Sequence, residues 1–256
     1  MSWQPFAQSA REMGVSLTPE QIDRFRRYTQ LLLEANRRVN LTALRDENAL
    51  IAKFHLDALA LIPVIAGAAG LAPDALCARA WRAADVGSGG GAPAIPLAIA
   101  WPALRYTLIE SIAKKARFLE QAAAALGLNL TVVNARAEDA GRASEHRAGY
   151  DLVTARAVAA LPTLVELTLP LARVGGLIVL PKGPRAPQEV AAAARAIDLL
   201  GGELVDVASV TIPGVEEIRT VVVIRKTAPT PATYPRRAGL PGRKPLTGAG
   251  LRKDAG

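Results

Sequence analysis

The sequence predicts an α/β fold built on a doubly wound, mostly parallel β-sheet. Three observations support this prediction. From Trp81 onward, short apolar runs alternate with helix-like segments, which is typical of parallel strands joined by right-handed crossovers. A glycine-rich turn at residues 85–93 follows the first of these runs. Near the end, two strand-like runs are separated only by Pro213-Gly214-Val215-Glu216, which is long enough for an antiparallel hairpin but too short for a crossover.

Residues 1–78 are expected to form a helical segment that packs on the main domain. Thr18-Pro19-Glu20-Gln21 is typical of a helix start, with a threonine cap, a proline in the first position and a glutamine in the third. Apolar residues at helical spacing follow, and Asn40-Leu41-Thr42 ends this helix. We expect Asp46 to cap the next helix, which continues to about Ile65.

The main domain is expected over residues 79–226. Its clearest helices are Ile112–Leu126 and the alanine-rich Pro187–Leu200. The predicted strands cover residues 81–86, 105–110, 130–134, 150–155, 176–181, 203–212 and 217–225. A seven-stranded, mostly parallel sheet that ends in an antiparallel hairpin is the Rossmann-like variant found in class I S-adenosylmethionine (SAM)-dependent methyltransferases.

Composition and cysteine usage exclude several protein classes. Half of the 256 residues are apolar, which suits a sizeable core and excludes global disorder. We expect no secretory signal, and no transmembrane helix because no stretch of about 18 uncharged apolar residues occurs. Cys77 is the only cysteine, so it suits a reducing cytoplasm, and with His55 and His146 it supplies too few ligands for structural zinc. We therefore expect a cytoplasmic protein with no such metal and no membrane partner, although a carboxylate site for a hard metal stays open.

Positive charge is concentrated near the C-terminus. The chain has a net charge of +8, and residues 225–256 carry seven of these eight charges. Five prolines beyond Lys226 predict an extended, basic tail over residues 227–256. Such a segment suits an anionic partner, and Tyr234 adds a stacking surface that favours RNA; a solubilising tail is the alternative. The candidate RNA contacts within it are Arg236, Arg237, Arg243 and Lys244.

The turn over residues 85–93 is the strongest ligand signal in the chain. Its glycines permit positive φ and let backbone N–H groups approach a ligand closely. The spacing Gly87-x-Gly89-x-x-Ala92 fits the loose dinucleotide fingerprint, so an NAD(P)-dependent oxidoreductase is an alternative. Asp85, two residues before the first glycine, favours SAM, which has no pyrophosphate and carries an ammonium group. A surface turn without a ligand is the remaining alternative.

Further candidates follow the other predicted strands, at the sheet edge where ligands bind in this architecture. Glu110 either accepts the two ribose hydroxyls of an adenosine or caps the following helix. Arg136-Ala137-Glu138-Asp139 supplies backbone N–H groups and an acid to flank an adenine. Arg156 is either a structural anchor of its strand or a ligand contact. Lys182 either meets RNA phosphate or is simply solvated.

The sequence offers no obvious general base. His55 and Asp57 are two residues apart on one helix and face different ways, so we expect His55 to be a packing residue. His146 lies in a predicted surface stretch, and the chain has no Tyr-x-x-x-Lys pair for an oxidoreductase to use. A non-catalytic RNA-binding protein is the second alternative, although it leaves the glycine turn unexplained.

Several short segments occur in a distinctive joint order and spacing. They are Asn40-Leu41-Thr42, His55-Leu56-Asp57, residues 85–89 with 93–97, residues 114–119, Arg136-Ala137-Glu138, residues 154–157, Pro181-Lys182-Gly183 and Tyr234-Pro235-Arg236-Arg237. In these segments the sequence closely resembles the bacterial small-subunit rRNA methyltransferase G family (RsmG, formerly called GidB). The resemblance extends from residue 17 to about 246.

The resemblance implies a cytoplasmic, monomeric enzyme that moves a methyl group from SAM to N7 of guanine 527, in the 530 loop of 16S rRNA. Its substrate is expected within a 30S subunit or an assembly precursor. Guanine N7 carries an exposed lone pair, so this reaction needs no general base. We expect Arg156 and Lys182 to be the catalytic candidates.

The resemblance also transfers cofactor contacts by position. They fall on Gly87, Ala92, Ala137, Glu138 and Arg156, and Gly89 and Glu110 complete the set expected from the strand ends. Two positions depart from the family pattern, which usually has a larger apolar residue in place of Ala92 and a glycine in place of Ala94. The first departure predicts weaker packing on the cofactor, and the second puts a methyl group near the turn.

Overall fold

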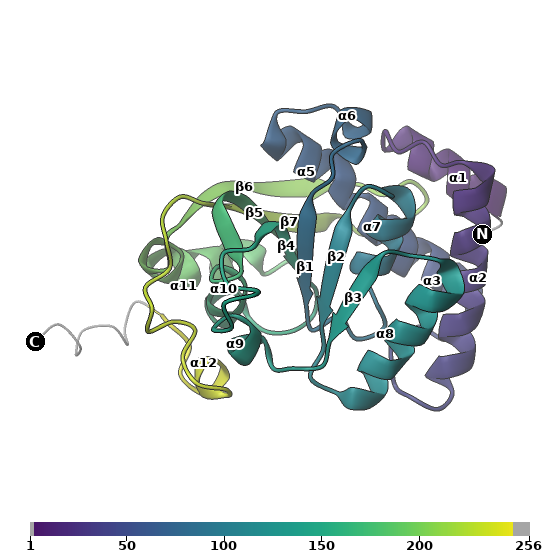
Figure 1. Ribbon diagram of the computed structural model, residues 1–256. Helices are drawn as coiled ribbons and strands as arrows, with labels where there is room; N and C mark the ends of the chain where they lie inside the picture. Colours follow the sequence, from purple (N-terminus) through teal and green to yellow (C-terminus); the bar gives the residue numbers. More distant parts are fainter. Residues whose placement is uncertain (1–2, 248–256) are drawn as a thin grey trace, which may run out of the picture.

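The computed structural model describes residues 3–247 and contains one seven-stranded sheet (Figure 1). The strands are β1 (Arg82–Val86), β2 (Arg105–Ile109), β3 (Leu130–Val133), β4 (Tyr150–Ala155), β5 (Ala172–Lys182), β6 (Gly202–Val210) and β7 (Arg219–Lys226). Their order is β3-β2-β1-β4-β5-β7-β6. The first five strands are parallel, whereas β7 is antiparallel to both β5 and β6. The predicted sheet and its antiparallel hairpin are confirmed.

Helices cover both faces of this sheet. They are α1 (Trp3–Glu12), α2 (Pro19–Asn36), α3 (Glu47–Leu50), α4 (Asp57–Leu59), α5 (Leu61–Ala69), α6 (Pro73–Cys77), α7 (Ala94–Ala100), α8 (Ala113–Leu126), α9 (Ala137–Ala140), α10 (Leu161–Thr168), α11 (Ala186–Leu199) and α12 (Leu240–Arg243). Neighbouring residues of β1 point to opposite faces: Ala83 joins an apolar cluster with α1, α2, α7 and α8, and Ala84 joins one with α10 and α11. The N-terminal helices therefore share one continuous core with the sheet.

Both predicted helix starts near the N-terminus are confirmed. The Thr18 hydroxyl accepts a hydrogen bond from the Gln21 N–H, and the Gln21 side chain accepts one from the Thr18 N–H. The Asp46 carboxylate accepts one from the Ala49 N–H. The helical run that follows is longer than expected, because it continues through a π-helical stretch (Ile51–Leu56) to Ala69.

This run, Glu47–Ala69, satisfies the length and composition requirements of a membrane span, and its most apolar window of 18 residues has a mean hydropathy of 1.8. However, 67% of its most apolar window is buried inside the protein. Burial of this extent is typical of a central core helix, whose surroundings are apolar on all sides.

The segment after β7 differs from the expected extended tail. Residues 227–247 fold back against the main domain, where Arg236 contacts Glu166 of α10, and the yellow chain in Figure 1 leads to α12. The Arg147 guanidinium donates to the Tyr234 carbonyl at 2.8 Å, and Arg142 donates to the Pro235 carbonyl at 2.7 Å. Long side chains of the main body thus satisfy the carbonyls of this proline-rich segment, which composition did not predict. The remaining part of the predicted tail, residues 248–256, lies outside the described residues.

Candidate functional site

The glycine turn lies at the carboxyl edge of the sheet, between β1 and α7. Gly87 and Gly89 have φ values of +70° and +55°, in the left-handed region that favours glycine. A Cβ atom at Gly87 would lie only 2.6 Å from Cγ2 of Val158. The Tyr28 hydroxyl donates to the Gly90 carbonyl at 2.5 Å, so the N-terminal helices help to hold the turn in place.

Asp85 is buried directly beneath this turn. Its Oδ1 atom accepts a hydrogen bond from the Thr154 hydroxyl at 2.7 Å, whereas Oδ2 has no hydrogen-bond partner among residues 3–247. Burial raises the pKa of Asp85 to about 7. A buried carboxylate oxygen without a donor is unusual, and it suits a cationic ligand group that brings its own N–H.

Glu110, at the end of β2, binds the backbone of the protein itself. One carboxylate oxygen accepts from the Gly89 N–H and the other from the Ile112 N–H, both at 2.8 Å. The first contact fixes the glycine turn, and the second holds the chain just before α8. Each carboxylate oxygen still has a lone pair to offer, so these contacts are compatible with ribose binding by Glu110, which stays a prediction.

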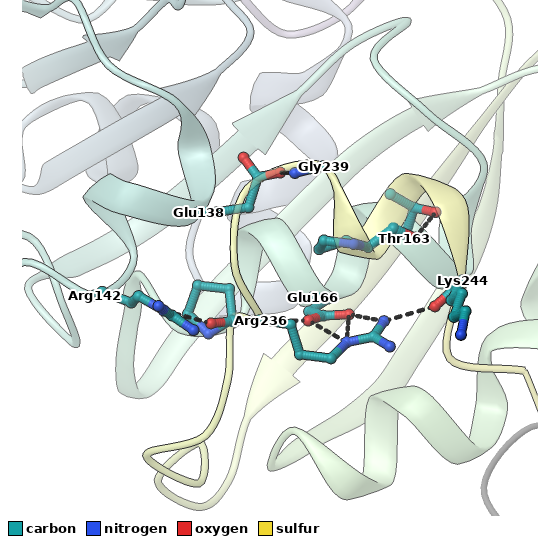
Figure 2. Close-up of polar contacts among 9 residues, drawn as sticks. Glu138, Arg142, Thr163, Glu166, Arg236, Gly239 and Lys244 are labelled. Atoms are coloured by element: carbon teal, nitrogen blue, oxygen red, sulfur yellow. Dashed lines mark hydrogen bonds and ion pairs between the residues drawn. The ribbon is translucent and has the colours of Figure 1, made fainter.

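Glu138, at the start of α9, faces a cavity of about 270 Å³ at the strand ends. Its Oε1 atom accepts a hydrogen bond from the Gly239 N–H at 2.8 Å (Figure 2). The cavity is bounded by the turn, by α9 and α10, and by the C-terminal segment; its lining includes Gly87, Ala137, Glu138, Thr163, Gly239 and Pro241.

Arg156, just after β4, faces a second cavity of about 310 Å³ on the other side of Gly87. Its guanidinium donates to the Lys53 carbonyl at 2.7 Å and lies 3.2 Å from Oδ2 of Asp57. The other oxygen of Asp57 accepts from Arg219 at 2.9 Å. Arg156 is therefore anchored to the N-terminal helices and also lines a cavity, so both of its predicted alternatives fit the geometry.

The second cavity lies between the glycine turn and the N-terminal helices. Besides Gly87 and Arg156, its lining includes Leu41, Thr42, Phe54, Ala92 and Lys115. Ala92 is thus at the cavity wall, where its small side chain leaves room. Ala94, in contrast, is fully buried in the core at the start of α7, so its methyl group is accommodated.

His55 is fully buried within a group of aromatic rings and shares a hydrogen bond of 2.7 Å with the Thr29 hydroxyl. Burial lowers the pKa of His55 to about 3, so its imidazole is neutral near pH 7. This is the packing role expected from the sequence.

Two predicted RNA contacts, Lys182 and Arg236, are held by acidic partners. The Lys182 ammonium lies 2.7 Å from Oε2 of Glu189, its side chain is 10% exposed, and it lines neither cavity described above. The Arg236 guanidinium lies 2.6 Å from Oε2 of Glu166, and its side chain is 20% exposed. Both cations are thus occupied inside the protein, which corrects the expectation that Lys182 is solvated or free to bind phosphate. Arg237, Arg243 and Lys244 are exposed.

Sequence reasoning did not assign a role to Asp57, Phe54 or Gly239. The sequence did carry a signal for two of them. Asp57 lies in a segment that resembles the family, and Gly239 lies shortly after another.

Within residues 3–247, no cluster of three or more His, Cys, Asp or Glu side chains is arranged to hold a metal ion.

Comparison with known proteins places this geometry in context. The family described as rRNA small subunit methyltransferase G matches residues 21–218. A protein of that name from Roseiflexus sp. (strain RS-1) is 49% identical over 93% of this chain and 97% of its own length. The protein of the same name from Deinococcus radiodurans is 43% identical, covering 93% and 90% of the two chains.

Solved structures with low sequence identity share the fold. The cofactor-bound protein Rv0187 from MTB superimposes with a TM-score of 0.52 at 19% identity, over 78% of this chain and 89% of that one. A structure of MtNAS with S-adenosylmethionine also gives a TM-score of 0.52, at 17% identity, over 78% and 73% of the two chains. These likenesses confirm the predicted fold class.

Proposed function

The chain belongs to the rRNA small subunit methyltransferase G family, and from this premise we propose that it methylates N7 of guanine 527 in the 530 loop of 16S rRNA. It is a methyltransferase, and S-adenosylmethionine is its methyl donor. The observation that carries the proposal is the pair of cavities that meet at Gly87, one beside Glu138 and the other beside Arg156. Family membership sets aside the oxidoreductase and the non-catalytic alternatives.

The residues around Gly87 fit SAM. Gly87 places bare backbone at the wall of both cavities, and the unpartnered Oδ2 of Asp85 suits the ammonium group, directly or through water. Glu138 has lone pairs left for the amino group of adenine. We therefore assign the adenosine part to the cavity beside Glu138 and the methionine part to the turn near Arg156. Besides Asp85, the proposed contacts are Gly87, Gly89, Ala92, Glu110, Ala137, Glu138 and Arg156.

The chemistry requires alignment rather than proton transfer. When bound, SAM supplies an electrophilic methyl group, which the lone pair of guanine N7 takes as the bond to sulfur breaks. The described lining of the cavity beside Arg156 agrees, since it contains Lys115 and Arg156 but no Asp, Glu or His. The guanine gains positive charge as N7 is methylated, and a bare cation nearby would oppose this change. The carboxylate of Asp57 balances the charge of Arg156 and so reduces that repulsion. The apolar side chain of Phe54 helps to exclude water.

Methylation of 30S subunits from a strain lacking this modification tests the proposal. With labelled SAM, we expect label in 16S rRNA and a single new site of aniline cleavage, at guanine 527. Parallel reactions with naked 16S rRNA and with assembly precursors identify the form of the substrate. Cleavage at another guanine, or label without aniline cleavage, would contradict the assignment of N7 of this nucleotide.

Salt dependence tests the proposed RNA contacts. The exposed cations Arg237, Arg243 and Lys244 belong to the C-terminal loop beside the adenosine cavity. Replacing all three with glutamine removes up to three phosphate contacts. The negative slope of log K, where K is the association constant for RNA, against log salt should therefore become shallower by about 2. Filter binding of a 530-loop RNA between about 50 and 200 mM salt measures this slope.

A matched triple variant controls for net charge. Arg11, Arg79 and Arg195 are also exposed, and they lie on α1, just before β1 and on α11, away from the carboxyl ends of the strands. Replacing these three with glutamine should leave the slope unchanged. Equal slopes for both triple variants would mean that the C-terminal loop makes no specific contact with RNA phosphate.

A further inference from the structure

Glu166 is a fully buried carboxylate in the middle of α10. All of the hydrogen bonds that it accepts within residues 3–247 come from Arg236: the backbone N–H at 2.8 Å, Nε at 2.9 Å and Nη2 at 2.6 Å (Figure 2). A buried charge without a partner costs several kcal/mol, so this carboxylate requires Arg236 to stay where it is. Arg236 follows β7 by ten residues, and in the sequence it looks like part of a basic tail.

Arg236 also closes a loop. Its Nη2 atom donates to the Lys244 carbonyl at 2.7 Å, so one guanidinium holds both ends of residues 236–244. Two further contacts attach this loop to the body of the protein. The Gly239 N–H donates to Glu138, and the Thr163 hydroxyl donates to the Pro241 carbonyl at 3.1 Å.

The tip of this loop forms one wall of the cavity that we assign to adenosine. Gly239, Pro241 and Gly242 line it together with Gly87 and Ala137. The Gly239 N–H occupies one lone pair of Glu138 Oε1 and so fixes the direction of that carboxylate. The shape of the cavity and the orientation of its acid therefore both depend on where residues 236–244 lie.

We infer that Glu166 and Arg236 are positioning residues for the methyl donor: their buried ion pair holds the loop 236–244 against the adenosine cavity and thereby orients Glu138. This inference rests on the proposed function, because it takes SAM to be the ligand of that cavity. Neither residue lines the cavity, so both act through the loop.

The Glu166→Gln variant tests this inference with little risk to folding. Glutamine has the same length and keeps a side-chain oxygen that can accept from Arg236, while the Arg236 guanidinium retains the Lys244 carbonyl and, with its side chain 20% exposed, some contact with water. Loss of the charge-assisted bonds should raise the Kd for SAM about tenfold in calorimetry. The KM for SAM should rise in parallel, whereas kcat at saturating SAM should change by less than about twofold, since the reacting atoms are untouched.

Arg236→Lys is the second variant, because it retains a positive charge for Glu166 but loses the planar fork that reaches Lys244. Amide hydrogen exchange should quicken in residues 236–244 of both variants. Arg173→Lys is the matched control: Arg173 lies 2.6 Å from Asp151, at the opposite ends of β4 and β5 from the cavity. This control should change neither the Kd for SAM nor exchange in the loop.

The outcomes separate this inference from the proposed function. If the wild-type protein does not bind SAM, the proposed function fails. If the wild type binds SAM and the loop of the variants exchanges faster with no change in Kd, the ion pair is merely structural and the inference is overturned. Unchanged exchange in the loop of both variants would also overturn it, because the ion pair would then not hold the loop.

Discussion

The Arg156→Gln variant is expected to lose about 100-fold in kcat/KM, the scale associated with removing one preorganised charged donor from an active site. Arg156 lines the cavity between the glycine turn and the N-terminal helices, and burial lowers the pKa of its guanidinium. A partly desolvated cation interacts strongly with a nearby carboxylate, such as that of the methionine part of SAM. Steady-state methylation of 30S subunits, with SAM and subunits varied separately, measures the loss.

Arg219→Gln is the control for this variant. Arg156 and Arg219 bind different oxygens of Asp57, at 3.2 Å and 2.9 Å, but only Arg156 lines the cavity. If Arg156 contributes by contact with the ligands, Arg219→Gln should retain most of the activity. If the two variants lose activity equally, the role of Arg156 is to hold Asp57 and the N-terminal helices in place, and our assignment of it as a ligand contact is wrong.

The fold could be predicted because its signals are local. Strand length, glycine turns and helix caps such as Thr18 and Asp46 depend on neighbours in the chain, and the structure retains them. The predicted four-residue link Pro213-Gly214-Val215-Glu216 excluded a crossover, which predicted the antiparallel hairpin before any pairing was known. The ends of elements were less predictable: β5 begins at Ala172, several residues before the apolar run that indicated it.

The contacts of the charged side chains could not be predicted, because their partners are distant in sequence. Arg236 and Glu166 are 70 residues apart, and Gly239 and Glu138 are 101 residues apart. Nothing near Arg236 distinguishes it from the exposed Arg237, so composition placed both in a basic tail. Only the fold shows that one cation neutralises a buried acid and the other faces solvent.

Asp85→Asn is expected to remove the pH dependence of SAM binding between about pH 5.5 and 7. Burial raises the pKa of Asp85 to about 7, so the free protein holds a proton on this carboxyl in that range. An ammonium group paired with Asp85 requires the carboxylate, and binding must therefore expel the proton. Wild-type affinity for SAM should then fall as the pH is lowered below 7, approaching tenfold per pH unit. His55, with a pKa of about 3, does not titrate in this range.

The variant isolates the charge of Asp85 because asparagine keeps an oxygen for the Thr154 hydroxyl. Its Kd should be at least about tenfold above that of the wild type at pH 7.5, where the wild-type carboxylate is ionised, and should be flat down to pH 5.5. Asp151→Asn, at the start of the neighbouring strand β4, should retain the wild-type profile. Calorimetry in two buffers of different ionisation enthalpy counts the proton released on binding. Release of a proton by Asp85→Asn at pH 6, equal to that of the wild type, would show that another group is titrating and that Asp85 does not face the ammonium of SAM.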